Sequence, residues 1–124
     1  MSSDLVVGLQ EGITTVELES RYDIAGNVKF ERTKDLLTKQ SKTIDPPRLL
    51  LDFNHTTFFG SNFVGLLFAL RRTLVDRGGR LALCSVSPEC LKVLEVVRFH
   101  TVCPIYKTRN EAIKALTDEA ATAE

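Results

Sequence analysis

The hydrophobic positions of this chain form short, nearly continuous runs and longer runs with a helical period. The short runs predict strands, since a strand needs roughly four to eight such residues between turn signals. Gln10-Glu11-Gly12 is a turn signal that joins the first two runs into a hairpin. Leu49-Leu50-Leu51 predicts a central strand covered on both faces, and Pro104 favours an edge position for the last strand. The predicted strands are 5–9, 13–18, 48–53, 81–84 and 102–106.

The longer runs predict four amphipathic helices, two of which begin with clear start signals. Ser87-Pro88-Glu89 offers a serine for the N-cap, a proline for the first helical position and an acid for the first turn. Thr108-Arg109-Asn110-Glu111 is a capping box. Gly78-Gly79 ends the second helix. The expected buried faces are Phe30, Thr33 and Leu37 in a helix at 25–41, Phe63, Leu66, Leu67, Leu70 and Leu74 in a helix at 62–77, then Leu91, Leu94 and Val97, and finally Ile113, Leu116 and Ala120.

Strands and helices alternate in the order β-β-α-β-α-β-α-β-α, which predicts a single α/β domain. The expected architecture is a small, mixed, mostly parallel sheet of about five strands with about four helices packed on it. The domain spans 1–124, with its core at about 5–117 and a frayed tail at 118–124.

Composition excludes several classes of function. Sixteen basic and sixteen acidic residues give a net charge of zero, which argues against direct nucleic-acid binding. The longest apolar run, Phe63 to Leu70, is too short to span a membrane, and no secretory signal is visible at the start. Three cysteines without close pairing favour a reducing, cytoplasmic location. We expect no metal, because paired-ligand spacings such as CxxC are absent. We expect no cofactor, and the glycine-rich phosphate loops GxxxxGK(S/T) and GxGxxG do not occur.

One enzymatic motif occurs in the chain. Cys103 and Arg109 match the Cys-x5-Arg signature of cysteine-dependent phosphatases, which need a thiolate at a helix N-terminus and a loop of amides around phosphate. The alternative is that Cys103 is a small buried residue in a strand and Arg109 lies in the first turn of a helix. The loop contains no glycine and Pro104 removes one amide, so the sequence favours a protein that is not an enzyme. His55 and His100 have no ligand-like spacing and are expected in loops.

Ser61 lies between a buried strand with its loop and the start of the most apolar helix. An N-cap serine stabilises a helix by about 1 kcal/mol, which is a sufficient structural reason for the residue. The same position also suits a reversible phosphate, because helix N-termini favour negative charge. Both interpretations stay open from the residues alone.

Six segments in order along residues 5–117 resemble STAS domains of the anti-sigma factor antagonist type. No single segment is decisive, and their order and spacing carry the resemblance. The segments are Leu18-Glu-Ser-Arg-Tyr-Asp23, Leu50-Leu51-Asp52-Phe53, Phe58 to Gly65, Gly78-Gly79-Arg80-Leu81, Ser87-Pro88 with Val93-Leu94-Glu95, and Pro104-Ile105-Tyr106.

The resemblance implies a bacterial, non-enzymatic regulator of transcription that works by partner switching. The unphosphorylated form would bind an anti-sigma factor that is also a serine kinase. Phosphorylation would end this binding, and a serine phosphatase would restore it. Ser61 occupies the position of the phosphorylated serine. The motif differs here, because Gly60, Asn62 and Phe63 replace the acid, the second serine and the glycine of Asp-Ser-Ser-Gly.

The partner is expected to dock on the second helix and the loop beside it. Val64, Phe68, Arg71 and Val75 cluster off the core stripe, and the alternative is that a wide buried face includes them. The self-association state is expected to be a monomer or weak homodimer. A STAS module that binds partners without phosphorylation is the competing hypothesis. The expected partner-binding residues are Asp23, His55, Thr56, Thr57, Gly60, Asn62, Val64, Phe68 and Arg71.

Overall fold

A computed structural model describes residues 5–19, 21–22 and 28–123. The chain begins with the predicted hairpin, β1 (Val6–Gln10) and β2 (Ile13–Glu17), paired antiparallel. Glu11 and Gly12 in the turn both have positive φ, at 55° and 78°. Two consecutive residues in this conformation are typical of a type I′ turn, whose twist matches that of the strands it joins.

The main sheet has five strands in the order β1-β2-β4-β6-β7. β4 (Arg48–Asp52), β6 (Arg80–Cys84) and β7 (Ile105–Tyr106) run parallel to β2, so the predicted mixed, mostly parallel sheet is confirmed. β4 is central, as its apolar run indicates, and Leu49, Leu50 and Leu51 have no exposed surface. β7 is at the edge, as Pro104 predicted, but Phe99–Thr101 forms a 3₁₀ helix, so the strand begins only at Ile105.

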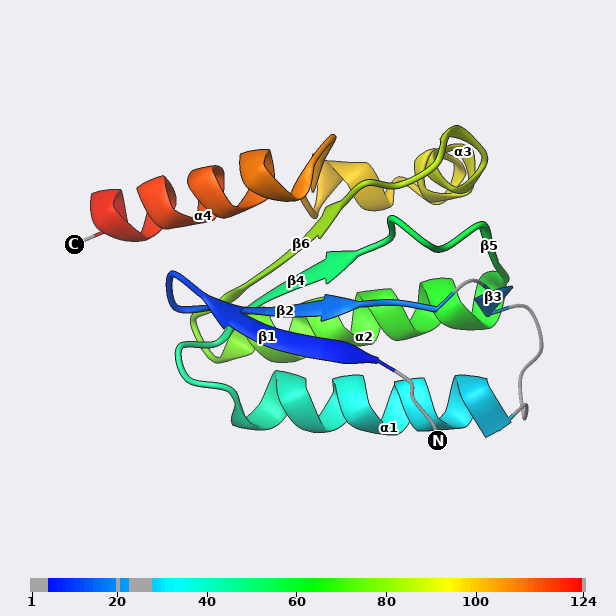
Figure 1. Ribbon diagram of the computed structural model, residues 1–124, viewed down its shortest axis with the longest axis horizontal. Coiled ribbons are helices and arrows are strands. Elements are labelled where there is room, and N and C mark those ends of the chain that lie inside the picture. The colour runs from blue at the N-terminus through cyan, green and yellow to red at the C-terminus, as the bar shows by residue number, and fades with distance from the viewer. Residues whose placement is uncertain (1–4, 20, 23–27, 124) are drawn as a thin grey trace.

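The helices cover both faces of this sheet. α1 (Val28–Thr43) and α2 (Ser61–Asp76) pack on one face, and α4 (Arg109–Ala123) lies on the other (Figure 1). α3 (Pro88–Val96) begins at the predicted cap, where the Ser87 side chain accepts a hydrogen bond from the Cys90 amide at 3.2 Å. Among the described residues, no helix is long and apolar enough to cross a membrane.

The predicted buried faces are confirmed for α1 and α2. In α3, Leu94 is buried and Leu91 partly buried, but Val97 is 40% exposed because the helix ends at Val96. Ile113 and Leu116 of α4 are buried, and the side chain of Ala120 lies outside the described residues. The prediction of a frayed tail at 118–124 needs correction, because α4 continues to Ala123 and Arg80 forms an ion pair with Glu119 in this segment.

The two glycines after α2 serve different purposes. Gly78 adopts a φ of +79°, a conformation that L-residues with a side chain rarely take. A Cβ on Gly79 would lie 1.8 Å from the Pro47 carbonyl oxygen, so only glycine fits beside that backbone. Together they allow α2 to end and the chain to turn directly into β6.

A second, two-stranded sheet was missed in the sequence. β3 (Arg21–Tyr22) pairs in parallel with β5 (Phe58–Phe59). β5 lies between the buried strand and Ser61, where the sequence predicted only a loop. Two-residue strands are too short to show a period, so no local pattern reveals them. This small sheet lies immediately before α2 and sets the position of the helix start.

Candidate functional site

Ser61 is the first residue of α2, and its side chain is exposed. The N-cap of the helix is Gly60, with extended backbone, and its carbonyl accepts hydrogen bonds from the amides of Phe63 and Val64 at 3.1 and 3.2 Å. The prediction that Ser61 caps the helix was therefore wrong by one position. The cap is a glycine, so the N-cap residue has no side chain that could accept a hydrogen bond from the first amides of α2. The Ser61 hydroxyl is consequently not committed to a capping bond.

The start of α2 suits negative charge. Its first turn contains no acidic residue, so no carboxylate competes for the positive end of the helix dipole. Amides left without a side-chain cap are the groups that helix N-termini offer to phosphate oxygens. A phosphate on Ser61 would thus meet a favourable local field.

A backbone hydrogen bond before Ser61 and aromatic packing after it hold the start of α2 in place. The Gly60 amide donates to the Tyr22 carbonyl at 2.9 Å, which ties the helix start to β3. On the other side of Ser61, the fully buried ring of Phe63 stacks on Tyr22, with centroids 4.7 Å apart and planes 13° apart. Phe63 also meets the rings of Phe30, Phe53 and Phe59. Phe63 therefore anchors the helix start inside the core.

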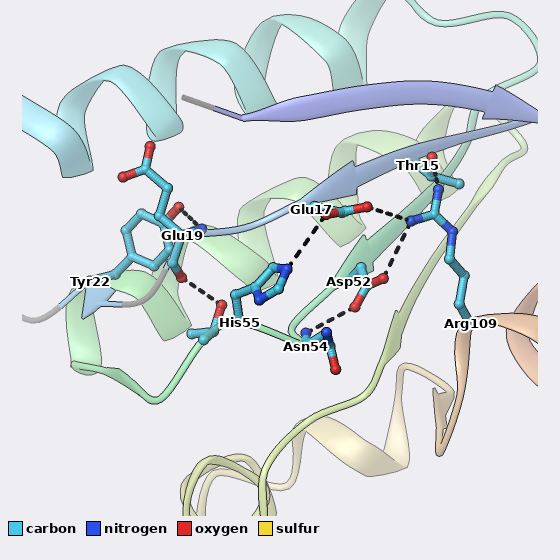
Figure 2. Close-up of polar contacts among 9 residues, drawn as sticks. Thr15, Glu17, Glu19, Tyr22, Asp52, Asn54, His55 and Arg109 are labelled. Atoms are coloured by element: carbon cyan, nitrogen blue, oxygen red, sulfur yellow. Dashed lines mark hydrogen bonds and ion pairs between the residues drawn. The ribbon is translucent and has the colours of Figure 1, made fainter. Parts of the chain in front are cut away.

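The loop between β4 and β5 is held by hydrogen bonds to neighbouring segments (Figure 2). The Asn54 amide donates to Asp52 Oδ1 at 2.9 Å, and the Thr56 hydroxyl donates to the Glu19 carbonyl at 2.7 Å. The Glu19 amide in turn donates to the Tyr22 hydroxyl at 2.8 Å. These bonds position the loop beside Ser61.

A charged cluster lies at the carboxyl ends of β2 and β4, at the first residue of α4. Arg109 Nη1 is 3.1 Å from Glu17 Oε2 and 3.4 Å from Asp52 Oδ2, and Nη2 donates to the Thr15 hydroxyl at 2.7 Å (Figure 2). His55 Nε2 lies 3.8 Å from Glu17. Asp52 is buried, so Arg109 supplies the charge that a buried carboxylate requires. Sequence reasoning missed this cluster, although Asp52 ends the central strand and Arg109 opens a helix.

The predicted partner-binding residues divide by exposure. His55, Thr57, Asn62 and Phe68 are exposed, and Gly60 and Arg71 are half-buried. Asp23 lies outside the described residues.

Two of these predictions need correction. Thr56 is 2% exposed because its hydroxyl turns inward to the Glu19 carbonyl, and Val64 is 6% exposed because the buried face of α2 is wide enough to include it. Neither side chain offers a free surface to a partner.

Beyond Val64, the off-core side of α2 is partly occupied by the segment around the 3₁₀ helix. The ring of Phe68 packs edge-on against buried Phe99 at 4.8 Å, and Arg71 Nε donates to the Val102 carbonyl at 2.7 Å. Phe68 nevertheless stays 39% exposed and Val75 44% exposed. An apolar strip with a charged border thus remains on this side of the helix.

Cys103 does not have the environment of a catalytic thiolate. It is 2% exposed, its thiol contacts the Leu81 carbonyl at 3.2 Å, and burial raises its pKa to about 12. Arg109 is engaged with Thr15, Glu17 and Asp52. A neutral buried thiol cannot attack phosphate, which counts against the phosphatase alternative. In the described part of the chain, no cluster of histidines, cysteines and acids could hold a metal ion.

Comparison with known proteins shows relatives with the same fold. The family model described as STAS domain matches residues 6–112. An anti-sigma-factor antagonist (STAS) domain protein from Planctomyces limnophilus is 28% identical, with a TM-score of 0.80 over 92% of this chain and 98% of that chain. The Bacillus cell fate determinant SpoIIAA in its phosphorylated form shares the fold, with a TM-score of 0.67 and 19% identity over 90% of this chain and 98% of that chain. A STAS-domain containing protein of Pseudomonas aeruginosa is 24% identical over 91 residues, 73% of this chain and 85% of that protein. Because the family model covers most of the residues, the chain belongs to the STAS domain family.

Proposed function

We propose that this chain is a non-enzymatic anti-sigma factor antagonist of a bacterial, cytoplasmic partner-switching pathway. It binds an anti-sigma factor that is also a serine kinase, and phosphorylation of Ser61 ends the complex until a serine phosphatase removes the phosphate. The observation that carries the proposal is the exposed Ser61 side chain at the first position of α2. Its structural neighbours support the proposal, since they include anti-sigma factor antagonists, among them SpoIIAA with and without phosphate.

Gly65 gives independent support for docking at this end of α2. Glycine inside a helix costs about 1 kcal/mol relative to alanine. A Cβ at Gly65 would meet nothing within 4 Å, so the fold itself does not require glycine there. Gly65 lines an open groove between α1 and α2 that also includes Asn62 and Leu66. Close approach of a partner's backbone is a physical reason to keep this position without a side chain.

Phosphorylation is tested by mass. The purified protein is incubated with ATP and each anti-sigma kinase encoded in its genome of origin, and its intact mass is followed. We expect one added phosphate, absent in Ser61→Ala. The proposal fails if no kinase adds phosphate, or if Ser61→Ala is phosphorylated equally.

Binding is tested with two variants at the same position. Ser61→Asp should weaken binding to the kinase by about tenfold or more, because a charge placed in a docked surface costs at least about 1.4 kcal/mol. Ser61→Ala should bind like the unmodified protein. Titration calorimetry measures both, and equal affinities would contradict the switch.

The competing function is a partner-binding scaffold that is not regulated by phosphate. The anchoring of Phe63 favours it, because a buried ring two residues after Ser61 restricts how far this segment can enter a kinase active site. Partner binding that persists in an unphosphorylatable chain, together with no added mass under any kinase, would establish the scaffold instead.

A further inference from the structure

β1 presents an unprotected edge of the main sheet. It pairs with β2 on one side, and no described strand pairs with its other side (Figure 1). The strand reads Val-Val-Gly-Leu-Gln, with no charge and no proline, and its register with β2 is continuous without a bulge. Natural edge strands usually contain a charged side chain, a proline or a bulge, each of which prevents pairing with another chain. Val6, Val7 and Leu9 are 61%, 44% and 72% exposed.

The hairpin geometry identifies which backbone groups face outward. In a two-residue type I′ hairpin, the residues that flank the turn exchange both of their hydrogen bonds, so Gln10 points its amide and carbonyl at Ile13. The alternation along the strand then directs Gly8 and Val6 toward β2 as well. The backbone groups of Val7 and Leu9 therefore point away from the sheet.

We propose that β1 pairs antiparallel with β1 of a second copy of this chain, about a twofold axis at Gly8. In this register Val7 lies opposite Leu9 of the other copy, and the outward amides and carbonyls of these residues complete hydrogen bonds in both directions. The Gly8 residues meet at a non-hydrogen-bonded pair, where Cα atoms approach to about 4.5 Å and a missing side chain helps. The two five-stranded sheets become one continuous sheet.

Self-pairing fits this edge better than pairing with an unrelated strand. The twofold axis brings Val7 and Leu9 of both copies together on the sheet face that carries Val16 and α1. No charged side chain of one copy lies opposite a charged side chain of the other in β1. A chain with a net charge of zero has no long-range repulsion between copies. This proposal does not depend on the proposed function, because β1 is an edge strand of the main sheet whereas Ser61 is the first residue of α2.

The first experiment measures self-association by analytical ultracentrifugation from about 10 µM to about 1 mM, since so small an interface predicts a weak dimer. We expect a monomer–dimer equilibrium that shifts at least tenfold toward monomer in Leu9→Lys. Val96→Lys is the matched control, because Val96 is 82% exposed on α3, and it should associate like the unmodified chain. A chain that stays monomeric throughout would overturn the proposal, as would a dimer that Leu9→Lys leaves unchanged.

The second experiment tests the register and does not depend on the lysine variant folding. Val6 and Gln10 lie opposite each other across the proposed axis in a non-hydrogen-bonded pair, whose side chains are close enough for a disulfide. Val6→Cys mixed with Gln10→Cys should form a covalent dimer under mild oxidation, whereas either variant alone should not. The chain's own three cysteines are buried and should not interfere. A dimer without this selective cross-link would place the interface elsewhere and refute β1 pairing.

Discussion

The buried cysteines show how environment sets the chemistry of single residues. Cys84 and Cys103 have almost no exposed surface, and desolvation by burial raises the pKa of each thiol to about 12. At Cys84 the nearby charge of Asp52 adds to the effect. Both side chains are therefore neutral, small apolar residues at neutral pH, and neither is a nucleophile.

Their titration predicts a loss of stability at alkaline pH. The unfolded thiols release protons near 9.0, whereas the folded ones keep theirs up to about 12. The folded state therefore binds more protons in this window, and the free energy of unfolding falls as the pH rises, by at most about 1.4 kcal/mol per unit for each thiol. Urea titrations between about pH 8 and about pH 10 measure it, below the range where tyrosines dominate. Cys103→Ala should lose about half of the slope, and a flat profile in both proteins would contradict this account.

At the scale of elements, α2 combines a structural face with a start that we propose to be functional. Its apolar stripe joins α1 to the sheet, while Gly60, Ser61 and Asn62 at its beginning contribute nothing to the core. Gly65 lies one turn along the helix on the exposed side. The stability of the helix and its proposed interaction with a partner can therefore be tested separately.

Gly65→Ala tests this separation. Because the added methyl meets open space inside a helix, the variant should be more stable by about 0.5–1 kcal/mol. The same methyl should weaken binding to the kinase if a partner's backbone approaches there. Thermal unfolding and calorimetry give the two readouts. A variant that is stabilised and also binds normally would remove Gly65 from the docking surface.

For the whole molecule, Arg109 connects layers that are far apart in the sequence. It joins the start of α4 to β2 and β4, and through Asp52 it reaches the Asn54 amide in the loop beside Ser61. Its contribution comes mainly from neutralising a buried carboxylate, because removing one partner of a buried pair leaves the other unpaired.

A double-mutant cycle measures this connection. Arg109→Gln should lower the free energy of unfolding by about 1–3 kcal/mol, because the buried carboxyl group of Asp52 loses a hydrogen-bond partner. Asp52→Asn combined with Arg109→Gln should cost less than the sum of the single changes, by about 1 kcal/mol or more. Amide exchange at Asn54 should also accelerate in the Arg109→Gln variant. Additive effects would show that the two side chains do not interact energetically.

The sequence by itself determined the order of the main-sheet strands and the four α-helices, the central position of β4 and the core stripe of α2, because these depend on local periodicity and on turn and capping residues. The resemblance to STAS domains suggested Ser61 as the candidate residue, but the predicted helix boundary was one residue off, since Ser61 and Gly60 are both acceptable caps by residue type.

Only the tertiary structure decided which residues meet. Arg109 and Glu17 are 92 positions apart, and Arg109 and Asp52 are 57 apart, so no local pattern relates them. The pairing of β3 with β5, the inward turn of Thr56 and the burial of Val64 also depend on neighbours from other segments. Local periods specify which face of an element is apolar. Packing between elements then decides how far that face is covered and which polar groups must find partners.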